Sequence, residues 1–276
     1  KKKLIYIMFS CVGVVITTHG DTGNVTINNI ENVVKYIPQS HIFVFNNESK
    51  CKIISNIPNK YPFINYTYID NQIKNHGLTG TWNMGVQKCL DIGCTVVVIL
   101  NNDVLINETI YSVLNHAISS YDKPFYYGVI SDFPGHSSKY QKFRPINQYL
   151  VSKNKNPISK EQWKKYTEND KDEIIQKLVK SNLIKQNQNI KINYGNGLTE
   201  LTKSDIYING FSLILTKKIL ELNKIGNSEY FNNKFPFSGN DNEWFHRCLK
   251  NNSKAFIDTN TWIKHYKYNS WRRLNK

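Results

Sequence analysis

The sequence lacks the cysteine patterns that mark disulfide-stapled or zinc-binding proteins. Its 5 cysteines are odd in number and scattered, and no two of them form a C-x-x-C pair. A disulfide framework uses an even set of cysteines, and a structural zinc site uses closely spaced pairs. We therefore expect free thiols, a reducing compartment and a cytoplasmic location.

Apolar runs long enough to cross a membrane are also missing. An apolar stretch from Leu4 to Ile16 follows three lysines and superficially resembles a signal peptide. It has no small-residue cleavage site, and it is shorter than the roughly 20 residues that span a bilayer. It leads directly into Thr17 and Thr18, so we interpret its end as a buried strand. We expect no membrane span.

Several nucleotide and nucleic-acid signatures are absent. Residues 77–80 (GLTG) lack the lysine and the spacing of a phosphate-binding P-loop, and no dinucleotide fingerprint occurs. Zinc-finger spacing, an RRM signature and an arginine-rich arm are missing too. The net charge of +15 therefore has two explanations. Either a basic surface attracts polyanions, or the lysine content follows from adenine/thymine-rich coding. We expect no specific nucleic-acid partner.

What the sequence does contain is an alternation of strand-like and helix-like segments. Helical spacing of apolar residues falls between β-branched runs, a pattern typical of a doubly wound, mostly parallel sheet with helices on its faces. One helix is expected to be capped by Asn107, a strand is expected at 206–209, and a helix is expected at 216–222. The earlier strands are predicted at 12–17, 41–45, 66–69, 95–100 and 125–130, with helical faces within 27–37, 82–90 and 110–117.

The middle of the chain has a different composition. Residues 131–194 are rich in lysine, glutamine and asparagine, and a capping-box pattern at 159–162 opens one of two helical stretches. We interpret this segment as a basic helical insertion packed on the main sheet. The whole of 1–276 is then expected to form a single domain.

Polar residues follow several of the predicted strands. In an open α/β sheet, ligands bind at the carboxyl ends of the strands. Asp103 comes directly after the most β-branched strand, where its carboxylate could hold Mg²⁺ or Mn²⁺, since both prefer oxygen ligands. It could equally cap the helix or turn that follows, and the residues alone leave both alternatives open.

Four segments, in order along the chain, resemble the family-two GT-A glycosyltransferases. They are 77–85 (GLTGTWNMG), 100–104 (LNNDV), 209–215 (NGFSLIL) and 238–247 (SGNDNEWFHR). The last is similar to the acidic motif of β-1,4-galactosyltransferases. The resemblance implies a GT-A fold, with a Rossmann-like, mostly parallel central sheet flanked by helices. It also implies a nucleotide-sugar-dependent transferase that uses Mn²⁺ or Mg²⁺.

The resemblance further implies a role for each matching position. Asp103 and His265 match metal-binding positions, and Asp241 matches the general base of inverting enzymes. Asparagine stands at 101 and 240, where many relatives carry an acid. The positions that match nucleotide-sugar contacts are Thr17, His19, Asn46, Asn47, Asn83, Asn101, Asn102 and Gly210.

These assignments together predict a metal-dependent inverting glycosyltransferase. The donor is expected to be a nucleoside-diphosphate sugar, with UDP as the nucleotide, and the acceptor a hydroxyl of a glycan or protein. Inverting transfer needs a base for the acceptor hydroxyl, and the metal stabilises the departing diphosphate. The insertion and residues 235–241 are expected to shape the acceptor side. Trp82 and Trp244 are interpreted either as sugar-stacking platforms or as core residues.

Three alternatives remain at this stage. A non-catalytic nucleotide-sugar or glycan-binding protein on the same fold would explain asparagine at positions 101 and 240. A nucleic-acid-binding module would explain the charge, and it would show oligonucleotide affinity with a steep salt dependence. A retaining transferase is the third, because the inverting assignment depends only on Asp241.

Overall fold

The computed structural model describes residues 9–19, 23–47, 51–69, 76–131, 165, 197–202 and 208–266. They form a nine-stranded mixed sheet in the order β3-β2-β1-β4-β8-β6-β9-β5, with β7 paired to β9. The strands are β1 (Val12–His19), β2 (His41–Asn47), β3 (Asn65–Ile69), β4 (Val96–Asn101), β5 (Val104–Leu105), β6 (Phe125–Ser131), β7 (Leu198–Leu201), β8 (Ser212–Thr216) and β9 (Lys254–His265). The helices are α2 (Gly23–Tyr36), α3 (Lys52–Ser55), α4 (Ile57–Lys60), α5 (Gly77–Asp91), α6 (Ile110–Ser119), α11 (Lys217–Leu222) and α12 (Asn240–Lys250).

Most strands of the sheet run in one direction. β1 is parallel to both β2 and β4, β2 is parallel to β3, and β6 is parallel to β9. β8 is antiparallel to both of its neighbours, β4 and β6. The short strands β5 and β7 are antiparallel to β9. The expected mostly parallel α/β architecture is therefore confirmed, with β8 reversed inside the sheet and β5 and β7 reversed beside β9.

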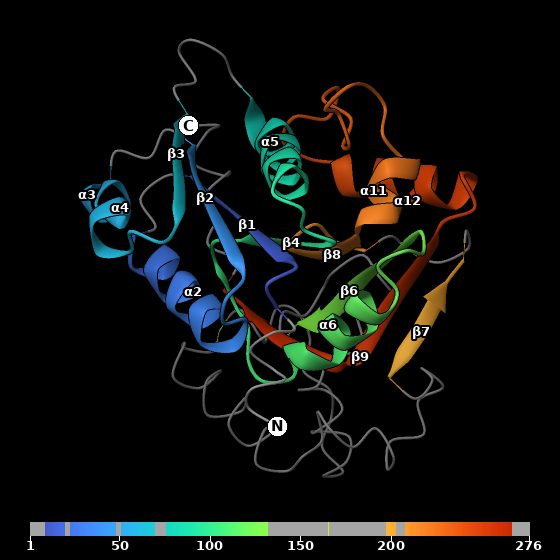
Figure 1. Ribbon diagram of the computed structural model, residues 1–276, viewed down its shortest axis with the longest axis horizontal. Helices are drawn as coiled ribbons and strands as arrows, with labels where there is room; N and C mark the ends of the chain where they lie inside the picture. Colours follow the sequence, from blue (N-terminus) through green and yellow to red (C-terminus); the bar gives the residue numbers. More distant parts are fainter. Residues whose placement is uncertain are drawn as a thin grey trace.

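Helices cover both faces of the sheet, and β4 shows how the sequence produces this. All of its residues from Val96 to Leu100 are fully buried, as expected of a strand with no face open to water. Val97 and Ile99 join the core beneath α5, α11 and α12. Val96, Val98 and Leu100 join the core on the opposite side, beneath α2 and α6. Figure 1 shows these two helical layers on either side of the sheet.

The burial of the two tryptophans, Trp82 on α5 and Trp244 on α12, decides between their two interpretations. Trp82 and Trp244 are 1% and 0% exposed, and both belong to the core on the α5 side. Of the two interpretations of these residues, the structure therefore supports core packing. Gly85 lets α5 approach β1 closely, since a Cβ at this position would lie 2.4 Å from a methyl group of Val15.

Three local predictions need correction or lie outside the described residues. Ile208 and Asn209 are not in a strand; the strand is β8, which starts at Ser212. Thr109, not Asn107, is the N-cap of α6, although the Asn107 side chain accepts the backbone N–H of Thr109 at 2.8 Å. The insertion lies outside the described residues apart from its first residue and Lys165, as do 206 and 207.

All 5 cysteines are free thiols. Among the described helices, none is both long enough and apolar enough to cross a bilayer.

Candidate active site at the carboxyl edge of the sheet

Most of the predicted site residues lie at one edge of the sheet. His19 at the end of β1 pairs with Asn47 at the end of β2. Thr17 pairs with Asn101 at the end of β4. Because β8 is antiparallel, its first residue, Ser212, lies beside Leu100 and brings the preceding Gly210 segment to the same edge.

Asp103, which follows β4, lies beside His265 at the end of β9. The Nε2 atom of His265 lies 3.3 Å from Oδ1 of Asp103, and the two residues are 6% and 7% exposed. Strand pairing creates this contact: Val104 pairs with His265, and the backbone N–H of Tyr266 donates to the carbonyl of Asp103 at 3.0 Å. The ring of Phe211 stacks on the imidazole with centroids 4.8 Å apart.

This donor pair suits a divalent cation that takes its remaining ligands from elsewhere. Mn²⁺ accepts both imidazole nitrogen and carboxylate oxygen. Two ligand atoms at right angles, each about 2.1 Å from a metal, are about 3.0 Å apart, close to the observed separation. Among the described residues, no group of three or more His, Cys, Asp or Glu side chains is arranged to hold a metal. Asp103 and His265 therefore fit a site completed by diphosphate oxygens and water.

Helix α2 clamps the turn that carries Asp103, a contact that no local sequence pattern indicates. The Nδ2 group of buried Asn29 donates to the carbonyls of Asn101, at 3.3 Å, and of Val104, which bracket the turn. Next to it, Nδ2 of Asn102 donates to Oγ1 of Thr26 at 2.9 Å. The side chain of Asn102 is thus used to attach the turn to α2. Its contact with a nucleotide sugar stays a prediction.

Asp241 lies at the start of α12 and is bonded to the Gly210 segment. Its Oδ2 atom accepts the backbone N–H of Gly210 at 2.9 Å, and its Oδ1 atom accepts that of Asn242 at 2.9 Å. The N-cap of the helix is Gly239, so Asp241 is not the cap. Only glycine fits at 210, because a Cβ there would lie 2.5 Å from the ring of Trp82.

The environment of Asp241 suits a base. Burial raises the pKa of its carboxyl above the ordinary value, and the N–H groups of Gly210 and Asn242 oppose part of that rise. A buried carboxylate of raised pKa binds a proton more readily than a solvated one, which is the property a general base needs. The carboxylate is held by backbone groups, so its position does not depend on flexible side chains.

Other residues of the acidic segment, 238–247, have hydrogen-bond or ion-pair partners within the fold. Asn240 donates from Nδ2 to Oγ1 of Thr79 at 2.9 Å and accepts the Asp241 N–H at 2.9 Å. Glu243 and Arg247 form a bidentate pair at 2.7 and 3.0 Å, with side chains 21% and 17% exposed. The pair is half-buried, and Arg247 also donates to the carbonyl of Tyr230 at 2.8 Å.

The side chains at the ends of β1 and β2 are mostly buried. Thr17 is 6% exposed, and its hydroxyl has no hydrogen-bond partner among the described residues. Asn46 is fully buried and donates to the hydroxyl of Tyr66 at 2.8 Å. Asn47 is 6% exposed, and the side chain of His19 lies outside the described residues. The nucleotide contacts of these four residues stay predictions.

Asn83 lies away from the strand ends, on α5. Its Oδ1 atom accepts the N–H groups of Tyr230 and Phe231 at 2.9 and 2.8 Å. Its Nδ2 group donates to the carbonyl of Phe231 at 2.8 Å and to Oδ1 of Asn233 at 3.2 Å. A nucleotide-sugar contact would require some of these bonds to be given up, and that role also stays a prediction.

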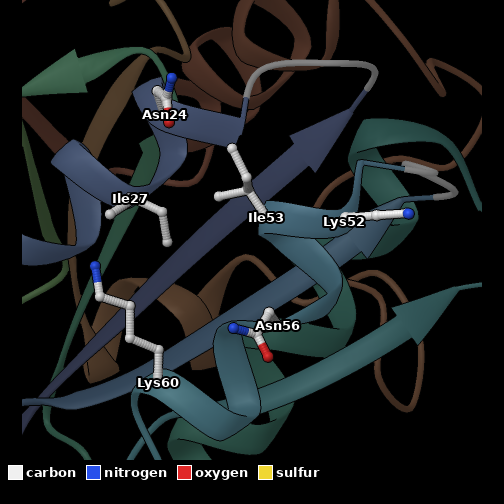
Figure 2. A pocket seen from close by; sticks show the side chains of 6 residues that line it. All are labelled: Asn24, Ile27, Lys52, Ile53, Asn56 and Lys60. Atoms are coloured by element: carbon white, nitrogen blue, oxygen red, sulfur yellow. The ribbon is translucent and has the colours of Figure 1, made fainter.

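A separate open pocket of about 550 Å³ lies between α2, α3 and α4 and contains none of the predicted site residues. Figure 2 shows Ile27 of α2 and Ile53 of α3 pointing toward one another across it. One of its two lysines, Lys60, forms an ion pair with Glu31 at 3.1 Å. We assign no function to this pocket.

Comparison with solved structures decides the fold. No protein-family profile matches the chain, and no curated protein is similar to it in sequence. The structure is similar to GalNAc-T7 solved with UDP, GalNAc and Mn²⁺, with a TM-score of 0.57 and 11% identity over 92% of this chain and 42% of that one. It is also similar to TarS of S. aureus, with a TM-score of 0.53 and 11% identity over 92% and 36% of the two chains.

The chain has the GT-A fold. A third similar structure is the 1–349 fragment of S. aureus TarS solved with UDP-GlcNAc, with a TM-score of 0.50 and 9% identity over 93% and 59% of the two chains. The chain thus spans less than two thirds of the length of these proteins. The GT-A fold brings the predicted metal pair, the Gly210 segment and Asp241 to one edge of its sheet.

Proposed function

We propose that the chain is a metal-dependent, inverting glycosyltransferase that moves a sugar from a UDP-sugar to a hydroxyl acceptor. The main observation in support is the 3.3 Å contact between Asp103 and His265 at the carboxyl edge of a GT-A sheet. The similar structures support the donor class, since GalNAc-T7 was solved with UDP and Mn²⁺, and TarS with UDP-GlcNAc. The finer assignments below rest on this chain's own residues.

Asp103 and His265 would hold the cation beside the diphosphate of the donor. The bound metal would supply charge stabilisation to the departing diphosphate, worth several kcal/mol. The protein contributes a rigid ligand pair, because Asp103 is fixed between β5, β9 and the Asn29 clamp. The ends of β1 and β2 would then contact the nucleotide, as expected for a ligand at the carboxyl edge of such a sheet.

Asp241 would remove the proton from the acceptor hydroxyl as the hydroxyl oxygen attacks the donor sugar. Its carboxylate is positioned by the N–H of Gly210, and the raised pKa favours proton uptake. Asparagine at 240 does not argue against catalysis, since its amide bonds Thr79 and the Asp241 backbone. The non-catalytic binding protein on the same fold remains the rival.

A turnover assay distinguishes the glycosyltransferase from the non-catalytic binding protein. UDP release from UDP-GlcNAc, UDP-GalNAc, UDP-glucose and UDP-galactose would be followed with Mn²⁺, with and without simple glycosides as acceptors. We expect release with one or more donors, and we expect Asp241→Asn to reduce it at least about 100-fold while donor binding persists. Asp122→Asn, an exposed substitution, is the control.

Three other results would redirect the assignment. Donor binding without any release by the wild type would favour the binding protein. Normal turnover by Asp241→Asn would place the base elsewhere. NMR of the product anomer tests the inverting assignment, and retention of configuration would contradict it.

A further inference from the structure

The segment that leads into α12 is bonded to α5 along its buried side. Thr79 donates its N–H to the carbonyl of Pro236 at 3.1 Å, and its hydroxyl donates to the carbonyl of Phe235. Asn83 holds the start of the same segment, through the backbone N–H groups of Tyr230 and Phe231. The backbone from 230 to 240 is therefore fixed relative to the sheet before any ligand arrives.

Two aromatic rings of this fixed segment face outward. Phe235 and Phe237 are 39% and 53% exposed, whereas Tyr230 and Phe231 of the same segment are 2% and 0% exposed. The bonds made by Thr79 involve only the backbone of 235 and 236, so they do not require either ring to face solvent. The two residues are separated in the sequence by Pro236 alone, and exposed apolar side chains that gather in one patch mark binding sites more often than scattered ones do.

The surface that carries Phe235 and Phe237, here called the aromatic surface, lies close to Asp241, the proposed base. The ring of Phe235 lies against Gly239, where an added Cβ would be 3.4 Å from its Cδ1 atom. Gly239 is the N-cap of α12, and Asp241 follows in the first turn. A general base must come within about 2.6–3.2 Å of the hydroxyl that it deprotonates. The rest of an acceptor held at Asp241 must then lie on the surface around it.

We propose that Phe235 and Phe237 bind the C–H face of a pyranose ring, which makes the acceptor a glycan. This inference rests on the proposed function, because it takes Asp241 as the base. A pyranose combines an apolar face with a rim of hydroxyls. The surface offers matching groups: two aromatic rings, and beside them the exposed side chains of Ser238 and Asn242. Lys234 is the single charged residue among 232–240.

Binding of small glycosides of defined structure tests the proposal. Saturation-transfer NMR would be recorded with methyl β-glycosides of glucose, galactose, GlcNAc and GalNAc, methyl α-mannoside and the corresponding β-linked disaccharides. Each would be measured with and without UDP and Mn²⁺. We expect at least one glycoside to bind, and we expect Phe235→Ala and Phe237→Ala to weaken it at least about tenfold, the scale of a lost aromatic contact.

Matched variants separate this role from a general effect on folding. Phe63→Ala removes a ring that is 59% exposed elsewhere in the fold, and it should leave glycoside binding unchanged. Phe237→Tyr keeps a ring and should retain binding. All four variants should keep the wild-type thermal shift with UDP and Mn²⁺, because none of these residues belongs to the predicted donor site.

Three outcomes would overturn the proposal. Glycoside binding that is equal in the wild type and in both alanine variants would show that sugars bind elsewhere. Absence of glycoside binding while UDP and Mn²⁺ still bind would exclude this acceptor class and leave the donor assignment intact. Selective binding of a serine- and threonine-containing peptide library, lost in Phe237→Ala, would assign the surface to polypeptide. If the proposed function fails instead, UDP and Mn²⁺ will not bind even though glycoside binding depends on both rings.

Discussion

Asp103 and His265 lie far apart in the sequence, and their side chains meet at 3.3 Å. The contact depends on the short strand β5, which places the residue after Asp103 beside His265 in an antiparallel pair. Both side chains are buried, and Asp103 follows β4 at the edge where the parallel strands end. We propose that this carboxylate and this imidazole form a metal-ligand pair, which would give the turn after β4 a chemical role beyond its structural one.

The clamp between α2 and this turn should matter for metal binding. Asn29→Ala removes the donor to the carbonyls of Asn101 and Val104, leaving buried acceptors without a partner. We expect a loss of about 1–3 kcal/mol in the free energy of unfolding, and a smaller Mn²⁺-dependent thermal shift with UDP. Asn28→Ala, at an exposed position of the same helix, is the control. Equal Mn²⁺-dependent shifts in the two variants would argue against a positioning role for Asn29.

Asp241 should make the stability of the fold depend on pH. Burial raises its folded pKa above the ordinary value of 3.8, so its favourable contribution is complete below that value. The contribution is then lost as the pH rises through the folded pKa. Asp241→Asn does not titrate. We therefore expect the wild type to lose stability relative to this variant as the pH is raised from 3.8 into the neutral range. Urea unfolding of both proteins across that range measures the difference, and a constant difference would refute the buried-base interpretation.

Arg247 should be a structural residue of the acidic segment. Besides Glu243, it donates to the carbonyls of Asn223 and Tyr230, and it thereby joins α12 to the start and the middle of the loop that follows α11. Lysine cannot reproduce this planar set of donors. We expect Arg247→Lys to lower the free energy of unfolding by about 1–3 kcal/mol, with Lys250→Arg as the exposed control. Unfolding midpoints that match in the two variants would show that these hydrogen bonds contribute little.

The fold was predictable where burial leaves a strong mark on the sequence. β1 and β4 are continuous apolar runs because both of their faces are covered. β9 was not predicted as a strand because its sequence mixes lysine, aspartate, asparagine and threonine with apolar residues. Its pairing with β6 is also interrupted by a register shift between Val129 and Ile130. Regular alternation, the usual signal of a strand, is lost across such an irregularity.

The site was predictable only in part, for a related reason. Asp103 could be singled out because a carboxylate at the end of a buried strand has a local signature. His265 and Asp241 were proposed from the resemblance to known enzymes. Asn29 carries no local signal, since an asparagine on a helix acquires its role only when a turn 72 residues away is packed beside it. Such tertiary partners cannot be read from periodicity or spacing.

The most direct test of the account is metal-dependent donor binding by the ligand pair. Thermal shifts would be measured with UDP and with UDP-sugars, with and without Mn²⁺, for the wild type, Asp103→Ala and His265→Ala. A donor at a hundredfold excess over its Kd should stabilise the wild type by about 2.7 kcal/mol. We predict that this stabilisation requires Mn²⁺ in the wild type and is lost in Asp103→Ala and His265→Ala. Full Mn²⁺-dependent stabilisation in Asp103→Ala would contradict the account.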